Sequence, residues 1–283
     1  MGDNSALTDA TPGIMLVRPS LHIDTEDNRA IFKRWTVMHF RDLLNLPALT
    51  PESNGIVRAL RYTNSAGELF YTIHADDIAI WASDAYKNRS GRLDLESTRN
   101  VEKGEEAVLQ GEHAFGGEPM VWDICNAEFA ILAEVDRDMR GGESYHELPI
   151  EWLSGKGTRP SAPESVLVTL TYTGEEGGYD NPPELLTSLQ SSVVKRLQLA
   201  YKDQSNGKMY TSLYRHLPDR QPDTHPVIGK GKDGNGSWVL CVFVEADVSD
   251  AVRGNLKAGL EDDVDKVGGG VRVGVWSGEV FMS

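Results

Sequence analysis

The order of the strands and helices that the sequence predicts is the feature that most constrains its fold. In the first half, short apolar runs typical of strands and amphipathic runs typical of helices follow the order β-α-β-β-α-β. The predicted strands are residues 11–21, 55–64, 69–74 and 120–124, and the predicted helices are residues 28–46 and 78–88. This is the order of a ferredoxin-like unit, whose helices cover one face of its sheet and leave the other face open.

The same order recurs in the second half. Its predicted strands are residues 165–173, 193–203, 237–246 and 270–276, and its predicted helices are residues 184–192 and 248–264. The recurrence indicates a duplication into a first repeat at 12–140, a Gly-, Pro- and Ser-rich connector at 141–164, and a degenerate second repeat at 165–283. We therefore expect an α+β fold in which two ferredoxin-like repeats pair the open faces of their sheets into an intramolecular α/β barrel that encloses a cavity.

The charge and the cysteines of the chain disfavour several classes of protein. A formal net charge of −15, from 43 acidic and 28 basic residues, disfavours binding to nucleic acid or to an anionic membrane surface. No run approaches the roughly 18 apolar residues that a membrane span needs, and the polar N-terminus lacks the pattern of a signal peptide. Cys125 and Cys241 lie far apart in the sequence, as expected of buried thiols in a cytoplasmic protein.

Motifs for metals and phosphates are weak. His74, Asp76 and Asp77 contain the ligand types of an iron site together with a second histidine, but their spacing does not favour one. The glycine-rich residues 229–237 lack the residue order of a phosphate-binding loop, and they precede a predicted strand rather than a helix. We expect neither a metal nor a cofactor.

One histidine lies on the apolar face of the first predicted helix, which Asp27 or Asn28 is expected to cap. The residues that recur there at helical spacing are Phe32, Trp35, His39, Asp42 or Leu43, and Leu46. His39 therefore points toward the sheet. It is either a packing residue hydrogen-bonded to the backbone, or the proton-transfer group of a site in which Asp42 orients the ring and raises its pKa. Spacing alone leaves both interpretations open.

The first half resembles the EthD-like members of the dimeric α/β-barrel superfamily. The resemblance rests on Trp35, His39 and Asp42 in the helix and on a following strand that ends in Arg61-Tyr62, and it covers about residues 12–125. It implies a barrel cavity that binds small aromatic or polyketide-like molecules, with His39 at the position of a recurring acid/base group. The second half matches in element order only, and its first predicted helix has no histidine equivalent to His39.

Strand alternation supplies the remaining candidates for the site, because residues two apart share a face. Arg58 is expected to share a face with Tyr62, and His74 to lie opposite Tyr71. The expected catalytic residues are His39, Asp42 and Tyr71, the last as a donor to a developing oxyanion. The expected substrate-binding residues are Trp35, Arg58, Tyr62, His74, Trp81 and Trp122. The tryptophans fit a core equally well, and the polar strand residues fit outward or edge positions.

These residues favour a cofactor-independent lyase or cyclase. It would decarboxylate a phenolic or polyketide-type molecule of secondary metabolism, or close a ring in it, with His39 as general acid/base. The alternatives are a cofactor-free oxygenase of a phenolic substrate and a non-catalytic small-molecule-binding or assembly protein. The expected partner is a small aromatic or polyketide-like substrate, without nucleic acid or membrane, and formation of a homodimer stays open.

Overall fold

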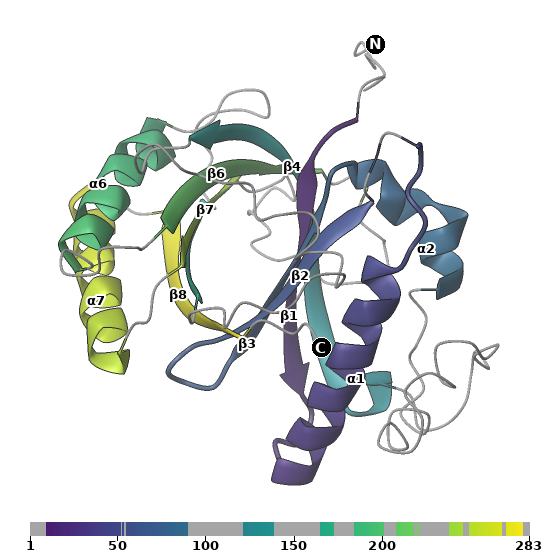
Figure 1. The fold of residues 1–283 in the computed structure, drawn as a ribbon. Coiled ribbons are helices and arrows are strands. Elements are labelled where there is room, and N and C mark those ends of the chain that lie inside the picture. Colours follow the sequence, from purple (N-terminus) through teal and green to yellow (C-terminus); the bar gives the residue numbers. More distant parts are fainter. Residues whose placement is uncertain are drawn as a thin grey trace.

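Eight strands in the described part of the chain close into a single barrel, in the order β1-β3-β2-β8-β5-β7-β6-β4 (Figure 1). The computed structural model describes residues 10–51, 53, 55–89, 121–138, 165–172, 184–200, 208–217, 220, 238–245, 249–267 and 270–279. The strands are β1 (Gly13–Leu21), β2 (Ile56–Thr63), β3 (Leu69–Ala75), β4 (Cys125–Asp138), β5 (Ser165–Tyr172), β6 (Lys208–His216), β7 (Trp238–Glu245) and β8 (Val271–Glu279). The helices are α1 (Glu26–Leu44), α2 (Asp84–Arg89), α6 (Glu184–Ala200) and α7 (Asp250–Val267), with short 3₁₀ helices η1 (Ile78–Ala82) and η3 (Val121–Asp123).

Each half of the barrel is one four-stranded antiparallel sheet. The first half has the order β4-β1-β3-β2, and the second half repeats it as β8-β5-β7-β6. The two sheets join where β2 pairs with β8 and where β4 pairs with β6. The expected α+β fold, with two ferredoxin-like repeats in one intramolecular barrel, is confirmed. The proposed connector at residues 141–164 lies outside the described residues.

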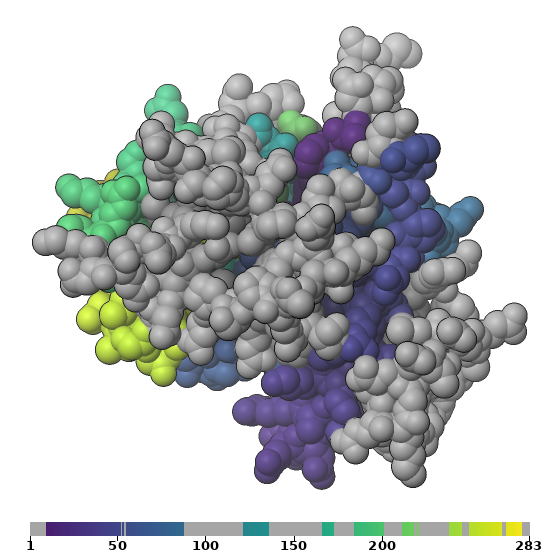
Figure 2. All heavy atoms as spheres, in the orientation of Figure 1, coloured from purple at the N-terminus to yellow at the C-terminus, as the bar shows by residue number. Residues whose placement is uncertain are grey.

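The helices lie outside the barrel. Figure 1 looks into the ring of strands, with α6 and α7 against one side and α1 and α2 against the other. Along β1, Met15 and Val17 pack into the core beneath α1, whereas Ile14 and Leu16 belong to the core inside the barrel. In Figure 2 the purple atoms of α1 form part of the outer surface. A sheet therefore separates every side chain that packs beneath α1 from the barrel interior.

Two predicted elements of the first half differ in the structure. Of the predicted strand at 120–124, the described residues 121–124 do not form a strand, because the backbone turns through η3 and β4 begins only at Cys125. The helix at residues 78–88 is divided into η1 and α2 at Ser83, whose hydroxyl donates to the carbonyl of Ile80 at 2.7 Å. The cap of α1 is Thr25 rather than Asp27 or Asn28, and its hydroxyl accepts from the amide of Asn28.

The second half differs more. The predicted strand at 193–203 is wrong over residues 193–200, because these residues continue α6, which is longer than the predicted helix at 184–192. Residues 201–203 lie outside the described residues. The buried residues of α6, Leu186, Leu189, Val193 and Leu197, recur at helical spacing, and this packing decides the conformation. The missing strand is β6, in which Leu213 faces the helices and Tyr214 faces the barrel interior. The element order of the repeat is preserved.

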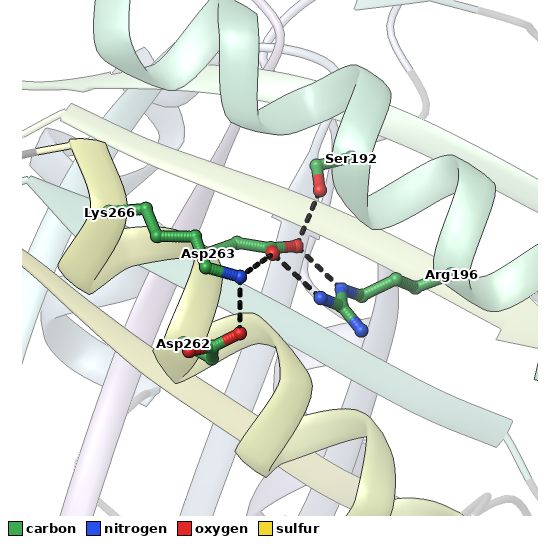
Figure 3. A network of polar contacts seen from close by, with 5 residues as sticks. All are labelled: Ser192, Arg196, Asp262, Asp263 and Lys266. Carbon is green, nitrogen blue, oxygen red and sulfur yellow. Dashed lines mark hydrogen bonds and ion pairs between the residues drawn. The ribbon is translucent and has the colours of Figure 1, made fainter.

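A partly exposed ion-pair network fastens α6 to α7 (Figure 3). The carboxylate of Asp263 on α7 accepts hydrogen bonds from Ser192 at 2.6 Å and from Arg196 Nε at 2.5 Å and Nη2 at 2.6 Å, both on α6. Its side chain is only 17% exposed. The Arg196 hydrogen bond is the main cause that lowers the pKa of Asp263 to about 2.

Among the described helices, none has the length and apolar character needed to cross a membrane.

We expect Asp263→Asn to lower the free energy of unfolding at neutral pH by about 1 kcal/mol, an estimate that allows for solvent screening of a partly exposed pair. The pKa of Asp263 is lower in the folded state, so its contribution is present above about pH 4 and is lost as the pH falls toward 2. The difference between variant and wild type in urea unfolding should therefore shrink with acidification. The control is Asp262→Asn, whose partner Lys266 is 63% exposed. An equal loss of stability in both variants contradicts the assignment.

Candidate functional site: a cleft at the end of the first sheet

A cleft of about 1170 Å³ lies beside the first turns of α1, where β1 ends, β2 turns into β3 and β4 begins. Its walls include Arg18 from β1, Phe32 from α1, Arg61 from β2 and Trp122 from η3. Pockets for small molecules typically enclose about 300–1,000 Å³. The cleft is therefore large enough for a multi-ring molecule.

The β2–β3 hairpin forms one rigid wall of the cleft. Asn64 Oδ1 accepts from the backbone amides of Ala66 at 3.0 Å and Glu68 at 2.9 Å, and Asn64 Nδ2 donates to Glu68 Oε2 at 2.7 Å. Gly67 adopts a φ of +78°, which favours glycine. The amide of Asn64 thus holds both the turn and the carboxylate of Glu68 in place.

Three ion pairs lie at the entrance, where two guanidiniums meet three carboxylates. Arg18 lies between Glu68, at 3.6 Å, and Glu128, at 3.8 Å. Arg29, in the first turn of α1, forms a close ion pair with Asp24. All of these groups are substantially exposed, so the pairs contribute little to stability and leave no large excess of charge at the entrance.

A guanidinium and a phenol meet in the wall between the sheet and α1. Arg61 and Tyr71 are directly opposite in the β2–β3 register, and Tyr71 belongs to the core on the helix side. The Tyr71 hydroxyl lies 3.1 Å from Thr36 Oγ1 on α1. Burial raises the pKa of Tyr71, whereas the charge of Arg61 and side-chain hydrogen bonds with Thr36 and Arg61 act in the opposite direction. Because burial is the larger effect, Tyr71 stays a neutral phenol around neutral pH.

Aromatic rings line the cleft and continue beneath α1. Phe32, only 2% exposed, stacks on Trp35 with 5.5 Å between ring centroids and on Tyr71 with 6.3 Å. Trp122 is half-buried and packs edge-on against Phe129. His22 Nε2 lies 3.2 Å from the carbonyl oxygen of Trp122, which ties η3 to the end of β1. Phe32 and Trp122 thus both line the cleft.

The structure divides the predicted site residues between the two faces of the first sheet. Those on the helix side are Trp35, His39, Asp42, Tyr71 and Trp81. His39 is half-buried and its ring stacks on Trp35 at 4.7 Å, with 12° between the planes. It follows Phe32 by seven residues, which is about 10 Å along the helix axis. His39 is therefore not part of the cleft, and its acid/base role and its orientation by Asp42 stay predictions.

Three other predicted residues lie inside the barrel. Tyr62 belongs to the interior core, the ring of His74 lies 5.4 Å from that of Phe243 on β7, and Arg58 is directly opposite His74. This arrangement agrees with the strand alternation. The alternation predicts that Arg58 shares a face with Tyr62 and that His74 lies on the face opposite Tyr71. The sheet separates these three residues from His39, so the structure does not bring the expected catalytic and substrate-binding residues into one pocket. Trp122 is the predicted residue that lines the cleft.

Sequence reasoning did not select Arg61 or Phe32 for the site. Strand alternation places Arg61 on the face opposite that of its neighbour Tyr62, and Phe32 lies on the apolar face of the first helix. Both positions hold in the structure, since Phe32 packs beneath α1 and Arg61 lines the same cleft. Two sequence features could have identified these residues: both are expected on the same side of the sheet, and Phe32 lies near the start of α1.

In the part of the chain that the structure describes, no group of three or more His, Cys, Asp or Glu residues is placed to hold a metal ion.

We expect Asn64→Ala to loosen the hairpin wall, because the substitution removes three hydrogen bonds at once. The free energy of unfolding should fall by about 1–2 kcal/mol. The amides of Ala66 and Glu68 should lose protection in hydrogen exchange. Ser65→Ala, in the same exposed turn, serves as the matched control. Unchanged protection at both amides would show that the Asn64 side chain does not hold the turn.

No protein-family model matches the sequence, and no curated protein matches it significantly. Among solved structures, the chain is similar to an anthrone oxidase-like protein, with 8% identity, coverage of 96% of this chain and 92% of that chain, and a TM-score of 0.44. It is also similar to a variant of chlorite dismutase from Candidatus Nitrospira defluvii, with 11% identity, coverage of 97% and 94%, and a TM-score of 0.40. A third is a heme-binding protein from Thermus thermophilus, with 10% identity, coverage of 95% and 90%, and a TM-score of 0.34. Similarity at this level carries no inference about function, and the EthD-like assignment stays a prediction.

Proposed function

We propose that the chain binds a small aromatic acid in the cleft at the end of the first sheet. The observation that carries the proposal is the joint presence of the Arg61 guanidinium and the Phe32 and Trp122 rings in the walls of one cavity. A guanidinium recognises a carboxylate through paired, charge-assisted hydrogen bonds. Aromatic walls bury the planar rings of such a ligand.

The charges around the entrance do not by themselves select an acidic ligand. Arg18 and Arg29 are each accompanied by carboxylates, which leaves the entrance near neutral. The whole chain carries a net charge of −15, so a long-range field would not attract an anion. Selection of an acid thus depends on the local contact with Arg61. Small-molecule binding is one of the alternatives that the sequence indicated, and the geometry favours it over a lyase or cyclase.

A lyase or cyclase that uses His39 requires this imidazole to touch the substrate. A molecule seated against Phe32 would have to extend about 10 Å along α1 to reach the imidazole of His39.

A cofactor-free oxygenase is the second candidate, and one observation favours it. Arg61 beside the neutral phenol of Tyr71 can stabilise a phenolate ligand, the electron-rich form that reacts with oxygen. Oxygen consumption that depends on an added phenol separates an oxygenase from a binding protein.

The test uses 2-naphthoate as the acidic probe and 2-naphthamide as its neutral counterpart, with binding measured by calorimetry. We expect the wild type to prefer the acid. Arg61→Met should weaken binding of 2-naphthoate by about 10–100-fold, the effect of losing a charge-assisted pair, and should change binding of the amide little. Lys195→Met, an exposed position on α6, removes the same charge without touching the cleft. No preference for the acid in the wild type contradicts the proposal.

His39→Ala distinguishes binding in the cleft from the acid/base hypothesis. We expect affinity for 2-naphthoate to stay within about twofold of the wild type, because the histidine lies two helical turns from Phe32. Phe32→Ala is the positive counterpart on the same helix and should weaken binding of both probes. If His39→Ala abolishes binding while the fold is retained in circular dichroism, the ligand sits along α1 and the site is misplaced.

A further inference from the structure

The hydroxyl of Thr36 gives a direction to the hydrogen bonds between α1 and the sheet. Thr36 Oγ1 lies 2.8 Å from the carbonyl oxygen of Phe32, four residues earlier, and donates its one hydrogen there. Its oxygen can then only accept from the Tyr71 hydroxyl at 3.1 Å. The phenolic hydrogen is therefore used within the wall, and Tyr71 cannot also donate it to a ligand. This differs from the oxyanion-donor role that the sequence predicted for Tyr71.

The phenolic oxygen of Tyr71 is left as an acceptor, and its neighbour on the adjacent strand is a donor. Arg61 lies directly opposite Tyr71 in the register and on the same face of the sheet. An arginine only donates hydrogen bonds, and the charge of Arg61, together with a hydrogen bond from it, acts to lower the pKa of the neighbouring Tyr71. The result is a directed chain that runs from Arg61 to Tyr71, then to Thr36, and ends at the backbone carbonyl of Phe32.

Every member of this chain except Arg61 is firmly fixed. Thr36 is 0% exposed and Tyr71 is 3% exposed. The ring of Tyr71 is held by Phe40, which packs edge-on at 5.3 Å, and by Phe32. The chain therefore connects Arg61 to a buried part of the core. Arg61 also lines the cleft.

We propose that Thr36 and Tyr71 are positioning residues that hold Arg61 in the orientation needed to bind the carboxylate of the ligand, and so set the selectivity for acids. The inference rests on the proposed function for the choice of ligand. A guanidinium held in advance loses less conformational entropy when the ligand binds than one that moves freely. Neither Thr36 nor Tyr71 contacts the ligand, so both act only through Arg61.

The test measures the selectivity ratio, the affinity for 2-naphthoate divided by that for 2-naphthamide. Tyr71→Phe keeps the buried ring and removes the acceptor, and Thr36→Val keeps the shape and removes the partner of the phenol. We expect both to lower the ratio by about 3–10-fold, as for the loss of a single orienting hydrogen bond. Thr36→Ser keeps the hydroxyl and should retain the ratio. Equal weakening of both probes indicates a merely structural role and overturns the inference.

Crystal structures of wild type and Tyr71→Phe without ligand test the positioning independently of binding. A guanidinium displaced from its wild-type place in Tyr71→Phe supports the chain, and an unmoved guanidinium overturns it. The two proposals can therefore fail separately. If the wild type shows no preference for 2-naphthoate, the proposed function fails whatever these structures show. If Arg61→Met abolishes the preference and Tyr71→Phe does not, only the positioning role fails.

Discussion

The structure depends on the antiparallel pairing that joins the two sheets, β2 with β8 and β4 with β6. These two joints convert two open sheets into one ring and bury the otherwise open face of each repeat without a second chain. They also leave no place for a helix except outside. The barrel interior is a core of its own, built from both repeats, in which the rings of Phe70 and Trp276 stack at 4.7 Å. Any site that involves α1 must therefore lie on the outer face of the first sheet.

The two repeats use their outer faces differently. Beneath α6 and α7 the core is almost entirely aliphatic, and the ion pair of Arg196 with Asp263 fastens the helices to each other. Beneath α1 the core is rich in aromatic rings and contains the hydroxyls of Thr36 and Tyr71. The first repeat combines this polar, aromatic layer with the cleft at the end of its sheet. The two repeats thus share a topology but differ in the chemistry of the layer between sheet and helices.

The sequence predicts the fold well because strand order follows from the alternation of apolar residues. It fails at Val193, where a short apolar run fits a helix and a strand equally well and only packing against the sheet decides. The site was predicted less well. The stripe that contains His39 shows that α1 faces a sheet, and the expected pairing of the open faces already puts that face away from the barrel interior, so His39 could not share a cavity with residues inside the barrel. No local pattern shows that the chain leaves a cleft beside Phe32, because the cleft depends on how three strand ends and a helix start meet.

The central claim is that ligand recognition occurs outside the barrel, at Arg61, and not within it. A crystal structure of the protein soaked with 2-naphthoate tests this most directly. The account predicts electron density for the ligand in the cleft, with its carboxylate on the Arg61 guanidinium and its rings against Phe32 and Trp122. Density inside the barrel, beside Arg58 and His74, would contradict it.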